Sequence, residues 1–251
     1  FSALPAGPFV ETLAWWKDDQ GVFIVRALGN IGFRNGVLRR SFEEVPLSSR
    51  VSLFADLMEG LRILAEGGYV HRRISPTSLV VYDSKGRLSL KIASLGDVCG
   101  GPQDWPCSPM DDRDSPAHAF YEPLEARAGA WTAKSDVYSA GVILRQMVFV
   151  GIGFWLPSAH MAVDDLFAPQ PAAARPYDVQ EDESLAAATE LAACAGEEPL
   201  AELLALLRRM LDSNAARRPD AAEVHAAVLS LGNLGKRAQD ILWDSILATY
   251  F

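Results

Sequence analysis

The feature that most constrains the fold is a stretch that predicts a helix without a wide polar face. Residues 135–144 (SDVYSAGVIL) are apolar on most sides of a helix. Such a helix is buried, so other elements have to surround it. The chain has 251 residues, of which 49% are hydrophobic and 22% charged. This is enough for one large domain or two small ones, and it excludes a disordered tail, a collagen and a disulfide miniprotein.

Charge and hydropathy narrow the classes of partner. The formal net charge is -9, and an acidic surface repels phosphate backbones, so nucleic-acid binding is not expected. The most apolar stretch, residues 142–156, contains Arg145 and Gln146 and is too short to cross a bilayer, so no transmembrane segment is predicted. The first residues lack a Met and a basic region, which is typical of an internal cut and not of a signal peptide.

The rest of the chain predicts a mixture of helices and short strands. Ser48 or Ser49 is expected to cap a helix that Gly67 and Gly68 end. A turn at 83–86 joins two of the strands, and its glycine tolerates a positive φ. The expected strands are 9–16, 22–28, 78–82 and 88–92; the expected helices are 48–66, one from 134 onward, 184–195, 198–212, 220–231 and 235–250; and the expected irregular stretches are 29–47, 94–123 and 151–185.

The three cysteines, Cys99, Cys107 and Cys194, leave two interpretations open. All three are free thiols, or Cys99 and Cys107 close a small disulfide ring in an oxidising compartment. The sequence contains no Cys-x-x-Cys motif and no Cys/His spacing typical of a zinc site.

Five short motifs follow one another in an order that resembles the large lobe of the protein kinase fold. Residues 70–79 (VHRRISPTSL) are similar to the catalytic loop, and residues 92–96 (IASLG) stand where the family has its Asp-Phe-Gly turn. Residues 123–125 resemble the Ala-Pro-Glu end of the activation segment, 134–139 the start of the central helix, and 217–219 the closing Arg-Pro. The resemblance implies an α+β, protein kinase-like fold with a mostly helical large lobe.

The same resemblance implies a reduced β small lobe. Residues 1–28 would be its remnant, a β hairpin and hinge strand, and residues 29–251 the large lobe with an irregular insertion near 151–185 and an extra C-terminal helix. No G-x-G-x-x-G precedes the strand at 22–28. Two explanations stay open: upstream residues are missing from this chain, or the protein lacks the Gly-rich loop.

The positions where this family performs its chemistry carry other residues. The catalytic Asp is replaced by Arg73, the loop Lys by Ser75, a metal-binding Asn by Ser78, and the Asp of Asp-Phe-Gly by Ser94. A guanidinium cannot accept a substrate proton, and a neutral hydroxyl is a poor Mg²⁺ ligand beside a carboxylate. Loss of a general base alone typically costs about 10²–10⁴ in rate. The resemblance therefore implies no catalytic residues, no cofactor, and ATP and Mg²⁺ binding that is absent or weak.

Residues that hold the lobe together in the family are retained. Asp136 can accept bonds from the backbone of the turn at His71 and Arg72, and Glu125 and Arg218 match an ion pair of the family. This contrast implies a pseudokinase, a catalytically inactive protein that acts as a scaffold or regulator by binding another protein.

Two alternatives and a narrower resemblance complete the predictions. A divergent nucleotide-binding or phosphotransfer enzyme would use non-standard carboxylates such as Asp97 or Asp83, and an unrelated all-helical interaction domain would lack the 78–92 hairpin. The degraded site, odd small lobe and long insertion are also similar to the secreted rhoptry and dense-granule pseudokinases of apicomplexan parasites, in the group without a Gly-rich loop (the bradyzoite pseudokinase group). That resemblance implies secretion into a parasitophorous vacuole or cyst wall, and it favours the Cys99–Cys107 disulfide.

Overall fold

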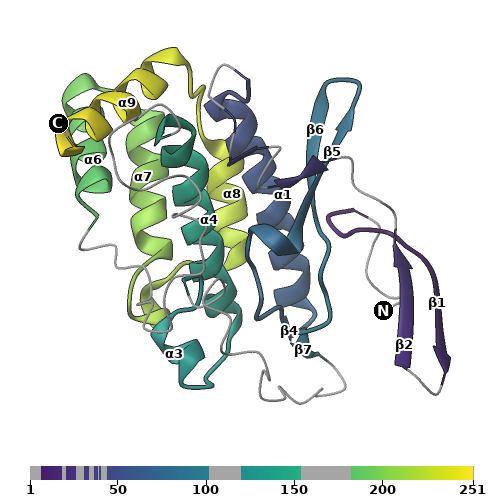
Figure 1. Ribbon diagram of the computed structural model, residues 1–251. Helices are drawn as coiled ribbons and strands as arrows, with labels where there is room; N and C mark the ends of the chain where they lie inside the picture. Colours follow the sequence, from purple (N-terminus) through teal and green to yellow (C-terminus); the bar gives the residue numbers. More distant parts are fainter. Residues whose placement is uncertain are drawn as a thin grey trace.

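Helix α4 (Ala133–Gly153) lies inside the helical body and supplies much of its core. The computed structural model describes residues 7–18, 21–26, 31–33, 37–38, 40, 44–101, 120–153 and 182–250. Val137, Ile143 and Met147 of α4 are fully buried, and helices α1, α7, α8 and α9 pack against it (Figure 1). The predicted buried helix is confirmed, and it extends a few residues into the stretch from 151 that was expected to be irregular.

The other elements make the fold α+β, as predicted. The helices predicted at 184–195, 198–212, 220–231 and 235–250 are confirmed within two residues. The described helices besides α4 are α1 (Leu47–Glu66), α3 (Leu124–Arg127), α6 (Glu183–Ala195), α7 (Glu198–Met210), α8 (Ala221–Ser230) and α9 (Lys236–Tyr250), with 3-10 turns η2 (Pro76–Ser78) and η3 (Ala215–Arg217). The described strands form three small sheets: β1 (Thr12–Asp18) with β2 (Gly21–Arg26); β3 (Ile31–Gly32), β5 (Leu79–Ser84) and β6 (Arg87–Ile92) in that order; and β4 (Tyr69–Val70) with β7 (Cys99–Gly100).

Helix α1 begins after a proline instead of a serine cap. Pro46 is the residue before the helix, and no side chain caps its N-terminus. The expected cap at Ser48 or Ser49 is therefore wrong, because the fixed φ of proline already suits a helix start. The helix ends at Gly67 as predicted, and Gly68 follows with a φ of 75°, a backbone conformation that favours glycine.

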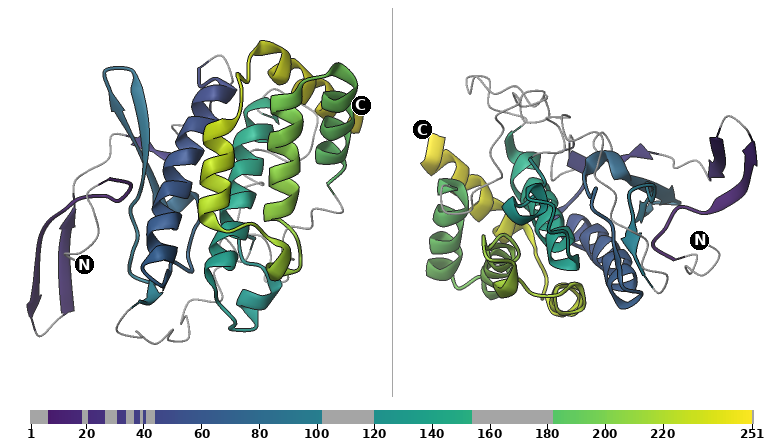
Figure 2. Two further views of the ribbon diagram at one scale, coloured as in Figure 1. Left: turned by 180° about the vertical axis from the view of Figure 1, so that it is seen from behind. Right: turned by 90° about the horizontal axis from the view of Figure 1, so that it is seen from below.

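The stretch predicted as one strand at 9–16 is divided between two sheets. β1 pairs with β2 through a register that is irregular at Thr12. The residues before it lie along β6 instead, where Val10 N–H donates to Ile92 C=O at 3.0 Å and Ile92 N–H donates to Pro8 C=O at 2.8 Å. One continuous strand is therefore wrong, because the chain changes its partner near this irregularity. In both views of Figure 2 the β1–β2 hairpin lies at the edge of the molecule, on the side of β5 and β6 that faces away from the helices.

The hairpin of β5 and β6 has the tight turn that the sequence predicts. Lys85 has a φ of 57° and Gly86 a φ of 83°, and a two-residue turn with both φ values positive suits the twist of the strands. Asp83 Oδ1 accepts the Gly86 N–H at 2.8 Å. β3 pairs with β5, placing Ile31 opposite Val81, so the stretch at 29–47, which was expected to be mostly loop, contains a short strand.

This hairpin lies directly against helix α1. Asp56 Oδ2 of α1 accepts the Leu90 N–H of β6 at 2.8 Å. A Cβ at Gly60 would lie 2.7 Å from Ile92 Cδ1, so glycine allows the close approach of helix and strand. The alternative of an all-helical interaction domain is wrong, because a β hairpin packs beside this helix.

Helix α9 packs on the body, as predicted, mainly against α6. Its buried apolar residues are Ala238, Ile241, Leu242 and Ile246. Helix α6 is also tied to α4, since Arg145 Nε lies 2.9 Å from Asp182 Oδ2. The other oxygen of Asp182 caps α6 by accepting the Leu185 N–H at 3.0 Å.

Arg50 is a buried cation that the sequence does not reveal. It lies in α1 with no exposed surface, and burial lowers its pKa to about 10. Nε donates to Val45 C=O at 2.9 Å, Nη1 to Met147 C=O at 3.3 Å, and Nη2 to Arg40 C=O. These three bonds join α1, α4 and the segment before α1.

Parts of two predicted irregular stretches, residues 102–119 and 154–181, lie outside the described residues. Among the helices that the structure does describe, none has the length and apolar character needed to cross a bilayer.

Candidate functional site

The candidate site is built on a turn that the first turn of α4 holds in place. Asp136 is buried, and its two carboxylate oxygens accept the N–H of His71 at 2.6 Å and that of Arg72 at 2.9 Å. Arg72 has a φ of 67°, which costs a non-glycine residue about 1–2 kcal/mol. Two hydrogen bonds to one buried carboxylate compensate for that strain, so Asp136 fixes where the following residues go.

Burial shifts the pKa of two titratable groups that meet at this turn, Asp136 of α4 and His71. It raises the pKa of the Asp136 carboxyl to about 7, against the opposing hydrogen bonds from the His71 and Arg72 backbone and the charge of Arg72. It lowers the pKa of the His71 imidazole to about 4, against the Ser94 backbone and the charge of Asp97. His71 Nδ1 accepts the Arg73 N–H at 3.2 Å, which suits a neutral ring protonated at Nε2.

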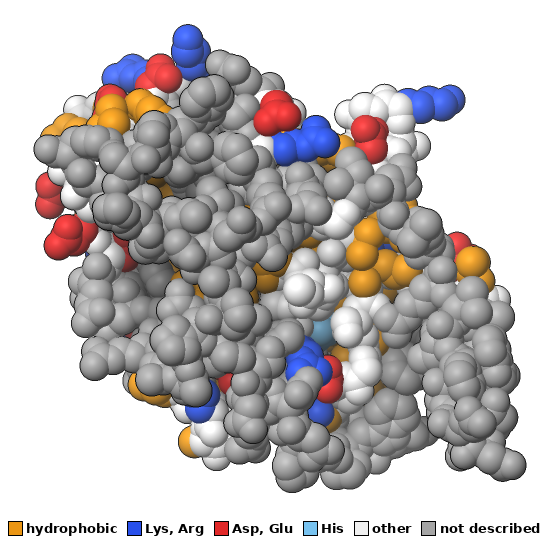
Figure 3. All heavy atoms as spheres, in the orientation of Figure 1, with side chains coloured by type: hydrophobic (Ala, Val, Ile, Leu, Met, Phe, Trp, Pro, Cys, Tyr) orange, Lys and Arg blue, Asp and Glu red, His pale blue; other side chains and the backbone are white. Residues whose placement is uncertain are grey.

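Asp97 binds both arginines of the turn. Its backbone C=O accepts Arg72 Nε–H at 2.6 Å, and its Oδ2 lies 3.2 Å from Arg73 Nη1. The Arg73 and Asp97 side chains are 20% and 27% exposed, so the pair lies at the surface of the site. Basic and acidic side chains lie together beside a histidine near the middle of the face shown in Figure 3.

Ser75 and Ser78 use their polar groups within turn η2. Both are buried at 2% exposure. Ser78 Oγ accepts the Ser75 N–H at 3.0 Å and donates to Ser75 C=O at 2.8 Å, while Ser75 Oγ lies 2.9 Å from Thr77 Oγ1. The two hydroxyls therefore close the turn and are not presented together to a ligand.

Ser94 follows β6 on the strand side of the same site. It is half-buried, and its neighbour Ala93 donates its N–H to Ser78 C=O at 2.8 Å. The segments 71–78 and 93–97 are thus adjacent, and they bring Arg73, Ser78 and Ser94 to one region. Asp83 is not part of it, because it lies exposed in the turn at the far end of the hairpin. In the described part of the chain, no group of three His, Cys, Asp or Glu side chains could hold a metal ion.

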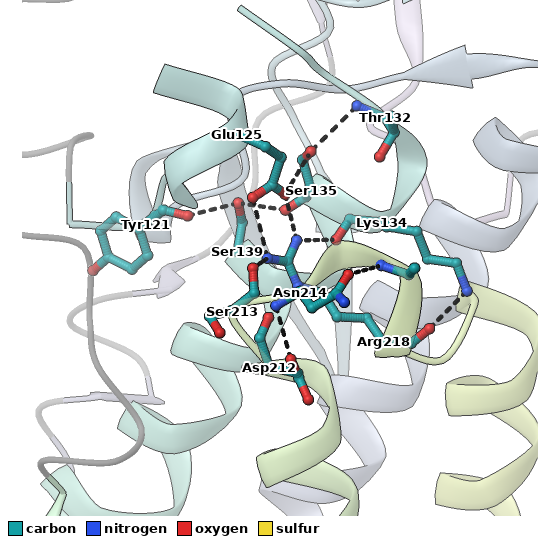
Figure 4. Close-up of polar contacts among 11 residues, drawn as sticks. Tyr121, Glu125, Thr132, Lys134, Ser135, Ser139, Asp212, Ser213, Asn214 and Arg218 are labelled. Atoms are coloured by element: carbon teal, nitrogen blue, oxygen red, sulfur yellow. Dashed lines mark hydrogen bonds and ion pairs between the residues drawn. The ribbon is translucent and has the colours of Figure 1, made fainter. Parts of the chain in front are cut away.

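A second cluster joins α3, the start of α4 and the residues around η3 (Figure 4). Its centre is Arg218, whose side chain has no exposed surface. Nη1 and Nη2 donate to the two carboxylate oxygens of Glu125 at 2.5 and 3.2 Å. The remaining donors go to backbone carbonyls: Nε to Asp212 at 2.7 Å, Nη1 also to Lys134 at 3.2 Å, and Nη2 also to Ser213 at 3.4 Å. Every N–H group of the guanidinium thus has an acceptor.

Three polar residues of α4 complete this cluster. Ser135 Oγ donates to Glu125 Oε1 at 3.2 Å, and Lys134 Nζ donates to Arg218 C=O at 2.8 Å. Ser139 Oγ donates to Tyr121 C=O at 2.8 Å. Sequence reasoning missed these partners, although Ser135 and Ser139 are one helical turn apart on a helix that is otherwise apolar, which is a usable signal.

The cysteines differ in state. Cys99 is buried in β7 at 1% exposure and is disulfide-bonded, whereas Cys194 on α6 is exposed and free. Cys107, the partner predicted for Cys99, lies outside the described residues.

Comparisons with known proteins found partial similarity to plant receptor-like cytoplasmic kinases. The chain is 28% identical over 123 residues to a calmodulin-binding receptor-like cytoplasmic kinase of Arabidopsis thaliana, covering 46% of this chain and 24% of that protein. It is 25% identical over 134 residues to an EPD1-interacting receptor-like cytoplasmic serine/threonine-protein kinase of Nicotiana benthamiana, covering 53% of this chain and 28% of that protein. No family model matches the chain.

The matched region thus spans about a quarter of the length of either plant protein. These partial similarities indicate a protein kinase-like relationship. They give no support to the narrower resemblance to apicomplexan secreted pseudokinases.

Proposed function

We propose that this chain is a protein kinase-like pseudoenzyme that transfers no phosphate and acts by binding another protein. One observation carries the proposal. Arg73 stands at the position of the catalytic Asp of the protein kinase family, and its Nη1 lies 3.2 Å from Asp97 Oδ2. A guanidinium donates hydrogen bonds and cannot take a proton from a substrate hydroxyl. The carboxylate beside it is already engaged in the ion pair.

The two serines at the positions of metal-binding residues support the same proposal. The Ser78 hydroxyl closes turn η2, and Ser94 offers a neutral hydroxyl where phosphate transfer relies on a carboxylate bound to Mg²⁺. Without these ligands, the charge of the phosphates is not neutralised. We therefore propose weak or absent binding of ATP with Mg²⁺.

The test combines a binding assay with a transfer assay on the whole chain. A ligand at about 100 times its Kd stabilises the folded state by about 2.7 kcal/mol, which raises the Tm of a domain of this size by about 5–10 °C. We expect no such shift with ATP and Mg²⁺, and no transfer of labelled γ-phosphate to the chain or to a peptide library. ATP without Mg²⁺, and Mg²⁺ alone, are the matched controls.

A divergent phosphotransfer enzyme remains the second candidate, and the position of Asp97 favours it. This carboxylate lies in the site and is part-exposed. Asp97→Asn separates the two candidates, because the substitution preserves the shape of the side chain and removes its charge. Phosphate transfer by the native chain that is lost in Asp97→Asn would establish the second candidate and refute the first.

The partner is proposed to be a protein because the net charge of -9 opposes binding of nucleic acids. Fluorescence anisotropy with labelled DNA and RNA at low salt should show no binding, and binding that weakens steeply with salt would contradict this choice. We also propose an oxidising compartment, which includes the secreted locations named above, because Cys99 is disulfide-bonded.

A further inference from the structure

The candidate site carries an excess of positive charge on a chain whose formal net charge is -9. Arg72 and Arg73 are consecutive, and Asp97 contacts the first through its backbone C=O and the second through its carboxylate. Asp136 lies deeper and accepts only backbone N–H groups, and burial raises the pKa of its carboxyl to about 7, so it is only partly ionised near neutrality. The two guanidiniums therefore outweigh the carboxylates beside them, and this region attracts an anion.

The ion pair of Arg73 and Asp97 leaves scope for a better acceptor. One oxygen of Asp97 forms it, with Oδ2 at 3.2 Å from Arg73 Nη1. Charge-assisted N–H···O bonds are typically about 2.7–2.9 Å long, and an arginine binds a carboxylate best through two parallel bonds. Asp97 is tethered by the bond of its own C=O to Arg72 Nε–H at 2.6 Å. A carboxylate from another molecule has no such tether and can adopt the two-bond geometry.

The loop that carries Asp97 offers a donor and open space. Ser94 is half-buried, and within the described residues no hydrogen bond engages its hydroxyl. Gly96 is exposed, and a Cβ at this position would meet no atom of the described structure within 4 Å. The Arg73 side chain is itself 20% exposed. A side chain of another molecule can therefore reach this loop and the guanidinium beside it.

We propose that Arg73 anchors an acidic side chain of the partner protein, an Asp or Glu whose carboxylate displaces Asp97. The inference rests on the proposed function, because it takes the partner to be a protein, and it adds the chemistry that this partner presents. Asp97 is then an internal competitor that occupies Arg73 while the partner is absent. Charge complementarity of this kind selects an acidic segment and rejects a basic one.

The test uses glutarate as the probe and the whole chain as the target. Phenylglyoxal modifies arginine side chains, and mass spectrometry gives its rate at Arg73 relative to Arg209, which is exposed on α7. Glutarate should slow the modification of Arg73 and leave that of Arg209 unchanged. Its neutral analogue glutaramide, with sodium chloride added to equal ionic strength, should protect neither arginine.

Two variants make the outcome decisive. Asp97→Asn should lower the glutarate concentration needed for half protection by about two- to fivefold, because the internal competitor is gone. Glu202→Gln is the matched control, since it removes one exposed carboxylate from α7 and should leave that concentration unchanged. Equal gains in the two variants would overturn the proposal, and so would an unprotected Arg73 in the native chain or protection by glutaramide.

The outcome is separable from that of the proposed function. A chain that transfers phosphate and whose Arg73 is protected by glutarate would refute the proposed function alone. A chain that transfers no phosphate and whose Arg73 is not protected would refute this inference alone.

Discussion

The ion pair between Glu125 and Arg218 gives the sharpest stability prediction. Arg218 has no exposed side-chain surface, and the Glu125 side chain is 22% exposed. Glu125→Ala leaves a buried guanidinium without a counter-charge, which costs about 3–5 kcal/mol in buried pairs. The three backbone carbonyls that also bind Arg218 remain, and Glu125 is partly screened by water. We therefore expect a loss near the lower end, about 3 kcal/mol.

The free energy of unfolding is measured by urea denaturation, followed by circular dichroism and Trp fluorescence. For a domain of this size, about 3 kcal/mol corresponds to a fall in Tm of about 6–12 °C. Glu202→Ala is the matched control, because Glu202 is an exposed carboxylate on the neighbouring helix α7. Its effect should stay within about 0.5 kcal/mol.

A double-mutant cycle separates the ion pair from the loss of packing. Arg218→Met should cost much less in the Glu125→Ala background than in the native chain, because the stranded charge is then gone. Effects that add within about 0.5 kcal/mol would refute the reasoning, and so would a loss below about 1 kcal/mol in Glu125→Ala.

Three further predictions concern other parts of the fold. Gly101→Ala should lower the free energy of unfolding, measured by urea denaturation, by about 1–3 kcal/mol more than Gly86→Ala. A Cβ at Gly101 would lie 2.1 Å from Tyr69 Cε1, whereas a Cβ at Gly86, which has a similar φ, would meet open space. Equal losses in the two variants would contradict this. The folded pKa of His71, about 4, lies below its ordinary value, so the unfolded state binds the proton first as pH falls, and His71 adds stability as pH rises from about 4 to about 6.5. His71→Gln should therefore flatten the stability gained between about pH 4.5 and pH 6.5, and an unchanged gain would argue against a buried neutral ring. Arg50→Met should cost roughly 3 kcal/mol by the same urea assay, because it leaves backbone carbonyls of Val45 and Met147 without their donor, whereas a loss below about 1 kcal/mol would mean that water replaces them.

The parts of the fold that local sequence determines were predictable. The turn at Lys85 and Gly86 and the end of α1 at Gly67 follow from the backbone freedom of single glycines. Helix α4 follows from an apolar pattern that repeats within a few residues. The start of α1 at Pro46 was missed, because a serine cap and a proline are both good helix starts and the sequence does not rank them.

Contacts between distant residues were not predictable. The hydrogen bond from Val10 to Ile92 and the burial of Arg50 depend on which segments meet in space. At the site, sequence reasoning treated Arg73 and Asp97 separately: Arg73 as the residue that replaces the catalytic base, and Asp97 as a carboxylate that an alternative enzyme could use. Only the folded chain places them in one ion pair, since the hairpin of β5 and β6 lies between them in sequence.

The outer edge of β6 has a consequence for solubility. Asp56 occupies the Leu90 N–H, and Pro8 and Val10 occupy both polar groups of the Ile92 backbone. An edge strand with free N–H and C=O groups is a template on which other chains can pair and aggregate. Here helix α1 and the N-terminal segment of the same chain occupy these polar groups. Deletion of residues 7–10 would therefore leave the Ile92 N–H and C=O free to pair with another chain, and the protein would aggregate more readily even if the helical body stayed folded.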